Sequence, residues 1–269
     1  MDKLFAGPWR LIRIERREGV VEVALNRTDA RNALNGELME ELTEAARLLR
    51  LRTDVRAVIL TGTGTYFSAG ADLSASEARR AQPSLLESRR AIMAGPDLCR
   101  AWEEIEAVTI AAIEGYCIGG AAALVLACDF RVMGEGAYLR LPEVPLGMNM
   151  SWRSLPRIVA LAGPSRAKQF VMFGEALDAG RCLAWGMADE AVGKGEALTA
   201  ARRWADKVAA LPPIPIRMTK EAVNAVAAAT AHASIYMDRD QYLLATSTQD
   251  FREGVAAFRE KRKGKFTGA

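Results

Sequence analysis

Two loops in the sequence share a design that suits the binding of negative charge. The first, TGTGTYFSAGADL at residues 61–73, follows the apolar stretch RAVIL, and the second, IEGYCIGGAA at residues 113–122, follows VTIAA. The first amides of a helix have no partner within it and carry partial positive charge. Glycine lets a ligand approach such a backbone closely. Two such loops side by side would direct two N–H groups at one oxygen, as an oxyanion hole does.

The same glycines also suit ordinary strand-to-helix turns, so each loop alone is a weak indication. Other chemistry is excluded more firmly, because the chain has one histidine, His232. Mechanisms and zinc sites that need two histidines are therefore ruled out, and we expect no metal site. His232 lies in the alanine-rich stretch AAATAHAS, which indicates a helix surface rather than a Ser-His-Asp triad.

Composition narrows the class of protein further. The 269 residues are 50% hydrophobic and carry a net charge of only +3, so the balance of charge does not point to nucleic acid. The N-terminus lacks the apolar region of a signal peptide, and we find no membrane span. Four scattered cysteines without a Cys-x-x-Cys pair indicate reduced, mostly buried thiols. We therefore expect a cytoplasmic protein.

Strand and helix patterns alternate over the first half of the chain. Residues 11–25 read as a hairpin around Glu18-Gly19, and residues 35–51 as an amphipathic helix that Asn35 caps. A buried strand, a helix over about 86–105 and further strand and helix units follow through about residue 142. This alternation predicts an α/β core.

From Ser151 onward the strand patterns stop and helices are expected. Helices are expected near residues 151–161, 164–174, 178–186, 195–211, 215–231, 234–247 and 250–262. We divide the chain into an α/β core at 1–195 and a helical region at 196–269. The basic tail FREKRKGKF has two interpretations, a solvated helix end or an anion-binding segment.

Several segments in fixed order resemble the crotonase superfamily, also called the enoyl-CoA hydratase/isomerase family. They are LNRTDARNALN (25–35), YFSAGADL (66–73), IEGYCIGGAAALVLACDFRV (113–132), LPEVPLGM (141–148), residues 163–192 and RMTKEAVN (217–224). The resemblance implies a spiral of repeated ββα units followed by a helical region that forms trimers and closes the active site. It also implies a coenzyme A thioester substrate, no permanently bound cofactor, and a homotrimer or dimer of trimers.

The resemblance assigns roles residue by residue. The amides of Ala71 and Gly120 would hold the thioester oxygen. Ala33 and Ala69 would lie at the adenine and pantetheine of CoA, and Asp72 and Leu73 would shape the same pocket. Arg27, Arg31 and the tail lysines are weaker candidates for contacts with the CoA phosphates.

The sequence departs from the family hydratases at one of their two glutamates. The first of these positions is Ala123 here, and the second, 20 residues later, is Glu143. An alanine cannot transfer a proton, so paired acid/base work by this route is lost. Glu143 could still move a proton from the carbon next to the thioester carbonyl, as in a double-bond shift. The plainer interpretation of Glu143 is a surface carboxylate at the end of a strand.

A second departure follows, where the family has a glycine-rich turn. This chain has LGMNMSWRSLPRI, in which Met148, Met150 and Trp152 make either an apolar pocket wall or ordinary core. Divergent hydratase-lyases for hydroxycinnamoyl thioesters also lack the first glutamate and use a tyrosine from the C-terminal helices. Tyr236 and Tyr242 lie in a comparable region, and the sequence does not choose between them.

We therefore expect an acyl-CoA enzyme in which Glu143 is the single acid/base. Isomerase-like or atypical hydratase/lyase chemistry is favoured over standard hydration. The alternatives are an acyl-CoA binder without catalysis and a structural oligomer without affinity for CoA.

Overall fold

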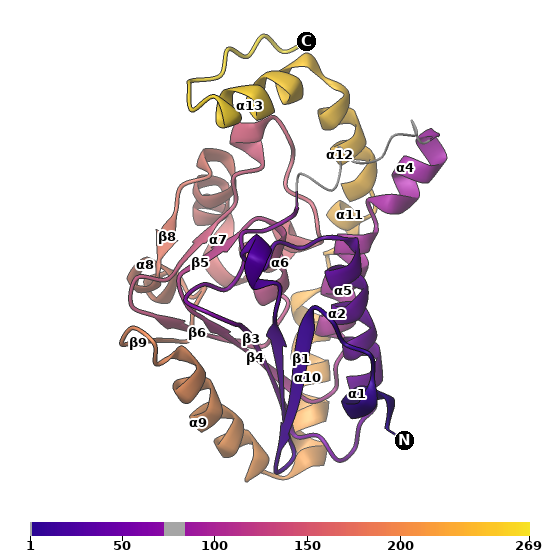
Figure 1. Ribbon diagram of the computed structural model, residues 1–269, viewed down its shortest axis with the longest axis vertical. Coiled ribbons are helices and arrows are strands. Elements are labelled where there is room, and N and C mark those ends of the chain that lie inside the picture. Colours follow the sequence, from indigo (N-terminus) through magenta and orange to yellow (C-terminus); the bar gives the residue numbers. More distant parts are fainter. Residues whose placement is uncertain (1, 73–83) are drawn as a thin grey trace.

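The computed structural model describes residues 2–72 and 84–269 (Figure 1). Leu73, expected to line the pocket, lies outside the described residues. Among those residues, no helix is both long and apolar enough to cross a membrane.

Within the described part of the chain, a six-stranded sheet carries the fold, in the order β1-β2-β3-β4-β6-β9. Its strands are β1 (Ile12–Arg17), β2 (Val20–Leu25), β3 (Ala57–Gly62), β4 (Val108–Ile113), β6 (Phe130–Gly134) and β9 (Glu190–Val192). The first two strands are antiparallel and every later neighbour is parallel. The residues of β4 are all buried, because helices cover both faces of the sheet.

A smaller sheet stands beside the first and makes the chain a spiral. It contains β5 (Tyr116–Ile118), β7 (Tyr138–Arg140) and β8 (Leu177–Asp178), with β5 parallel to β7 and β8 antiparallel to it. The chain gives β4 to the large sheet and β5 to the small one, then β6 to the large and β7 to the small. The expected repeated ββα units are therefore present.

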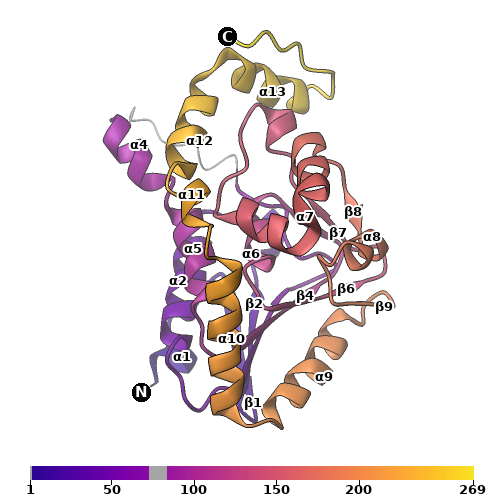
Figure 2. The ribbon, with the colours of Figure 1, turned by 180° about the vertical axis from the view of Figure 1, so that it is seen from behind.

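Helices pack on both faces of the large sheet (Figure 2). The N-terminal and central helices are α1 (Lys3–Ala6), α2 (Gly36–Leu49), α4 (Leu85–Ala91), α5 (Ala94–Glu103), α6 (Gly120–Val125), α7 (Ser154–Phe173) and α8 (Ala179–Ala184). The larger core lies between the sheet and α2, α5 and α6. Two short 3₁₀ turns, η1 (Thr28–Ala30) and η2 (Val144–Leu146), complete this part.

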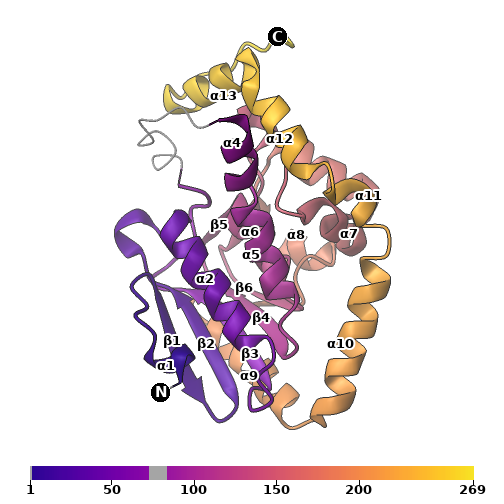
Figure 3. The ribbon, with the colours of Figure 1, turned by 90° about the vertical axis from the view of Figure 1, so that its right-hand side faces the viewer.

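The C-terminal region is helical, as expected. It consists of α9 (Ala197–Ala209), α10 (Pro213–Ala227), α11 (His232–Ile235), α12 (Asp238–Ser247) and α13 (Gln249–Arg259). The buried alanines of α9 form a second core against β3, β4 and β6. In contrast, α10 touches β4 but has no buried residue (Figure 3). α9 follows residue 195 but packs on the sheet of the core. The division into a core at 1–195 and a helical region at 196–269 therefore stays a prediction.

Two local expectations are corrected, and a third is confirmed. Strands do not stop before Ser151, since β8 and β9 follow it; with two and three residues they are too short to show an alternating pattern. The helix expected over 86–105 is two helices, α4 and α5. The two helices expected at 151–161 and 164–174 are present as the two arms of α7, which Gly163 interrupts with a non-helical φ of 78° and ψ of 163°.

Candidate functional site

The two glycine loops meet in space, as their design requires. Ser68 forms a parallel bridge with Cys117, and the Ile118 amide donates to the Ser68 carbonyl at 3.2 Å. A β-carbon at Gly70 would lie 2.6 Å from the Ile118 carbonyl oxygen, closer than side chains allow. Gly70 also has a φ of +89°, so both space and backbone require glycine. The residues that follow, Ala71 and Gly120, are thereby brought to neighbouring positions.

The Ala71 amide points away from its neighbouring strand. Leu34 binds both flanking residues: its amide donates to the Gly70 carbonyl at 2.8 Å, and its carbonyl accepts from the Asp72 amide at 3.0 Å. Since backbone groups alternate along an extended segment, the Ala71 N–H faces the other side. Among the described residues it donates no hydrogen bond. It is therefore an open donor on an exposed residue.

The Gly120 amide is the second open donor. Gly120 is the first residue of α6, and the residue before it, Gly119, has φ 56° and ψ −125°. The Gly119 amide donates to the Arg140 carbonyl at 2.8 Å, and the Gly119 carbonyl accepts from the Ala123 amide at 3.0 Å. These bonds hold the turn, while the Gly120 N–H has no acceptor within the described parts of the chain.

Glu143 lies directly beside this turn. A β-carbon at Gly119 would be 2.9 Å from Glu143 Oε1, so glycine makes room for the carboxyl group. Oε2 is shielded from solvent and has no hydrogen-bond partner among the described residues. Burial raises the pKa of Glu143 to about 7, against the weaker lowering effects of its own backbone amide and of Arg140. The carboxyl can therefore both accept and return a proton near neutral pH.

Tyr242, from α12, is the tyrosine that approaches Glu143. Its hydroxyl donates to Met148 Sδ at 3.4 Å, and burial together with the Glu143 charge raises its pKa. Tyr236 is 58% exposed and its ring lies 6.1 Å from that of His232. The sequence left the two open, because the contact between Tyr242 and Met148 joins residues far apart in the chain.

Trp152 forms a wall of the site. β-Carbons at Gly120 and Gly95 would lie only 2.5 and 2.1 Å from its ring, so the indole lies flat against α6 and α5. Trp152 and Arg153 both have positive φ, 61° and 57°. Asp238 holds this turn by accepting the Arg153 amide at 3.0 Å. The contact of Trp152 with Gly95 and the support from Asp238 had no signal in the sequence.

The expected CoA-binding residues lie in one neighbourhood. The Ala69 amide donates to the Arg31 carbonyl at 3.1 Å. Arg27 donates to the Ala33 carbonyl at 2.9 Å and to Asp72 at 2.6 Å. Asp72 therefore joins the first donor loop to the segment that contains Ala33, and Arg27 forms an ion pair with Asp72.

The two-sheet spiral with its helical C-terminal region is a crotonase fold, in which two open amides and a buried carboxyl group meet. An enoyl-CoA hydratase/isomerase from Pseudoalteromonas atlantica T6c has a TM-score of 0.84 at 25% identity, over 96% of this chain and 100% of that chain. An enoyl-CoA hydratase from Bacillus anthracis has a TM-score of 0.76 at 32% identity, over 97% of this chain and 100% of that chain.

Sequence comparison gives the family. The model for enoyl-CoA hydratase/isomerase matches residues 15–269. A probable enoyl-CoA hydratase echA8 of Mycobacterium bovis is 32% identical over 96% of this chain and 98% of its own length. A crotonyl-CoA hydratase of Syntrophomonas wolfei is 30% identical over 94% of this chain and 96% of its own length. The chain belongs to the enoyl-CoA hydratase/isomerase family.

Proposed function

We propose that the chain is an enzyme acting on acyl-CoA thioesters. The amides of Ala71 and Gly120 hold the thioester oxygen, and Glu143 takes a proton from the carbon next to the carbonyl. The electron pair left behind moves onto the oxygen as an enolate, which the two amides stabilise. One observation carries this proposal: two open amides and a solvent-shielded carboxyl group converge around Gly119.

Isomerase-like or atypical hydratase/lyase chemistry fits this site better than standard hydration. Ala123 is buried in α6 and brings no proton-transferring group. Glu143 alone can return its proton at another carbon, which shifts the double bond. Tyr242 offers a second acidic hydrogen close to Glu143, as an atypical hydratase or lyase would need.

The CoA moiety arrives with the substrate, and we propose no permanently bound cofactor. Ala69 and Asp72 belong to the first donor loop, and Arg27 links this loop to the Ala33 carbonyl. Their role in binding CoA, and that of Leu73, remains a prediction. The Arg27–Asp72 pair supports a role for Asp72 in holding this loop rather than in direct contact with CoA.

A panel of 3-enoyl-, 2-enoyl- and hydroxycinnamoyl-CoA thioesters tests the reaction, with Tyr242→Phe as the diagnostic variant. We expect turnover of a 3-enoyl- or hydroxycinnamoyl-CoA to exceed hydration of 2-enoyl-CoA. If the reaction is isomerisation by Glu143 alone, Tyr242→Phe keeps the wild-type kcat. If it is hydration or cleavage, the variant loses about 10²-fold or more in kcat. Tyr236→Phe, at an exposed tyrosine, is the matched control, and rapid standard hydration that is unaffected by Tyr242→Phe would contradict the proposal.

The alternative is an acyl-CoA binder without catalysis, which Ala123 favours. Calorimetric binding of CoA thioesters without turnover of any panel member would support it. A structural oligomer without affinity for CoA would show no rise in Tm at CoA concentrations far above plausible Kd values.

We also propose a homotrimer or a dimer of trimers, supported by the unusual exposure of α10. None of its residues is buried, and Ile214, Met218, Val223 and Val226 are 59–80% exposed. An apolar cavity of about 690 Å³ separates this helix from α7 and the start of β6, and its lining includes Leu126, Leu211, Ile216 and Ala227. Exposed apolar surface on this scale is typical of an interface.

The four buried, unpaired thiols support a cytoplasmic location.

Light scattering after size exclusion is expected to give three or six times the 29.2 kDa chain mass. Val226→Glu should shift this mass toward the monomer, because Val226 is 80% exposed in one chain and a buried charge disfavours an interface. Leu51→Glu, at a residue 69% exposed beyond α2, is the control and should leave the mass unchanged. A monomeric wild type would contradict the proposal.

A further inference from the structure

The backbone of α13 touches the backbone of the turn that follows Glu143. A β-carbon at Gly254, within α13, would lie 2.6 Å from the carbonyl carbon and oxygen of Leu146. From the other side, a β-carbon at Gly147 would lie 2.7 Å from the Phe251 Cα. Only glycine permits approaches this close, so the two elements fit without intervening side chains.

The turn in question fixes the backbone of Glu143. Glu143 is the residue before η2, and its carbonyl accepts from the amides of Leu146 at 3.0 Å and Met148 at 2.9 Å. Gly147 ends the turn with a φ of 77°. A displacement of η2 would therefore move Glu143 with it, away from its place beside Gly119.

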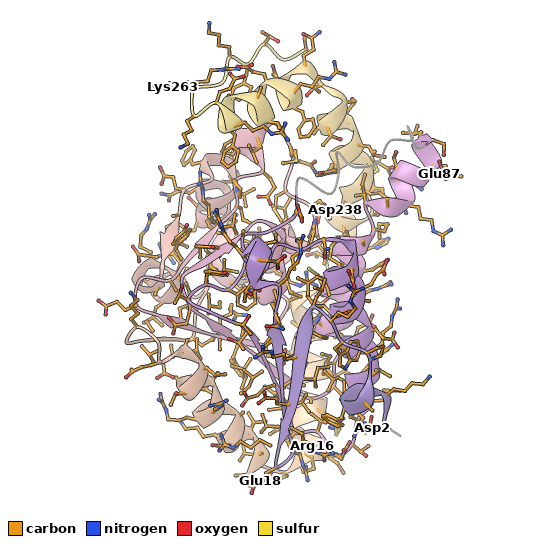
Figure 4. The ribbon with its side chains drawn as sticks, viewed as in Figure 1. Asp2, Arg16, Glu18, Glu87, Asp238 and Lys263 are labelled. Atoms are coloured by element: carbon orange, nitrogen blue, oxygen red, sulfur yellow. The ribbon has the colours of Figure 1, made fainter. Side chains whose placement is uncertain are left out.

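The C-terminal tail holds α13 in place on its outer side. The chain doubles back after α13, so that the Gln249 amide at the helix start donates to the Ala269 carbonyl at 2.7 Å. Asp250 accepts from the amides of Thr267 and Gly268, both at 2.8 Å. The basic tail, marked by Lys263 in Figure 4, thus runs beside α13 at one end of the molecule.

The preceding helix, α12, is fixed at its own contacts. Arg89 of α4 binds Asp240 through two bonds of 2.6 and 3.0 Å. Asp238, labelled at the start of α12 in Figure 4, accepts the Arg153 amide. Because α12 and α13 are each anchored, Gly254 meets Leu146 at a defined position.

We propose that Gly254 is a positioning residue, whose close contact with Leu146 holds η2 and keeps the Glu143 carboxyl beside Gly119. The inference rests on the proposed function only in treating Glu143 as the group that moves the proton. It gives the C-terminal helix and its tail a part in the site without contact with substrate.

Several charged and titratable groups lie on the elements that pack near Glu143 or against η2. Arg140 of β7 lowers its pKa, and Tyr242 of α12 lies within the field of its charge. On α13, Asp250 binds the tail amides and Glu253 binds Arg262. On α7, Arg157 binds Glu103. The removal of water by the covering elements is therefore the main cause of the raised pKa of Glu143.

Gly254→Ala tests the inference, because helix propensity and the close contact with Leu146 predict opposite effects of this substitution. Alanine within a helix is favoured over glycine by about 1 kcal/mol, so a helix with free space would become more stable. Here the new methyl group must push α13 and η2 apart. We expect kcat to fall about 10- to 100-fold, as misplacement of a reacting group by about 1 Å can do, with KM changed less than about threefold.

Gly180→Ala is the matched control, because Gly180 also lies in a helix but its nearest neighbour would be Asp178 Oδ1 at 3.5 Å. This variant should keep wild-type kcat. Asp250→Ala provides a second variant on the same path, since it releases the tail amides without adding bulk. It should lower kcat in the same direction by a smaller factor.

Titration of Glu143 by NMR of protein labelled with ¹³C at the glutamate carboxyl separates this inference from the proposed function. Glu143→Gln assigns the resonance. We expect a midpoint near 7 in the wild type and a lower midpoint in Gly254→Ala, as water reaches the carboxyl. Unchanged midpoint and kcat in Gly254→Ala would overturn the inference. A lowered midpoint in a protein that turns over no thioester would sustain it and refute the proposed function.

Discussion

Glu143→Gln is expected to lower kcat on the preferred thioester by about 10²- to 10⁴-fold, the usual contribution of a positioned acid or base. Glutamine keeps the shape of the side chain but cannot take the proton. KM should change little, because the amides of Ala71 and Gly120 still hold the carbonyl. Steady-state kinetics on purified protein measures both. Glu135→Gln, at an exposed glutamate in the turn after β6, is the control and should behave as wild type.

The pH dependence of the wild type follows from the same carboxyl group. As a base, Glu143 must be ionised, so kcat/KM should rise with pH and level off above its pKa of about 7. An ordinary glutamate would level off near 4.5. A profile that is flat between pH 5 and 8 would contradict the assignment of Glu143 as the base.

Stability should change in the opposite direction to activity. The folded pKa is raised from 4.5 to about 7, so the folded state favours the neutral carboxyl. Below pH 4.5 the Glu143 carboxyl is neutral in both the folded and the unfolded state. Glu143→Gln should then leave the free energy of unfolding unchanged. Between pH 4.5 and about 7 only the unfolded state loses the proton, so the free energy of unfolding falls, and it levels off above 7. Glu143→Gln should therefore relieve about 3 kcal/mol at pH 8. Denaturant unfolding at pH 4.5 and pH 8 measures the difference.

The sequence predicted the elements whose patterns are local and long. β3 and β4 are apolar runs bounded by loops, and both donor loops follow such runs directly. The pairing of Ser68 with Cys117 then brings the donors together, as neighbouring strands should. In contrast, β8 and β9 owe their existence to hydrogen bonds with β7 and β6, and two or three residues carry no period.

The candidate site was predictable where its function lies in backbone groups and less so where it depends on contacts between distant segments. Gly119 and Gly120 are apparent from their place after a strand. Tyr242 approaches Glu143 only because α12 brings its hydroxyl to Met148, and Trp152 reaches Gly120 through a turn with two positive φ values. Neither arrangement has a local pattern that would predict it.

Ala71→Pro is expected to remove one of the two oxyanion donors while leaving the fold intact. The Ala71 N–H donates to no acceptor in the described residues, so its loss breaks no hydrogen bond there. Loss of one such donor lowers kcat by about 10²- to 10³-fold, or about 3–4 kcal/mol in the barrier. Ala71→Gly, which keeps the N–H, is the matched control. Equal kcat in Ala71→Pro and Ala71→Gly would contradict the assignment of this donor.

Combining Ala71→Pro with Glu143→Gln asks whether the two groups act on the same transition state. The amides stabilise an oxyanion that exists only if Glu143 removes the proton, so the two losses should not multiply. The double variant is expected to fall little below Glu143→Gln alone, as for residues that work as a unit. Calorimetric binding of a CoA thioester should persist in all three variants. A binder without catalysis would show the same affinities but no kcat for any substitution to lower, which makes this comparison decisive between the two proposals.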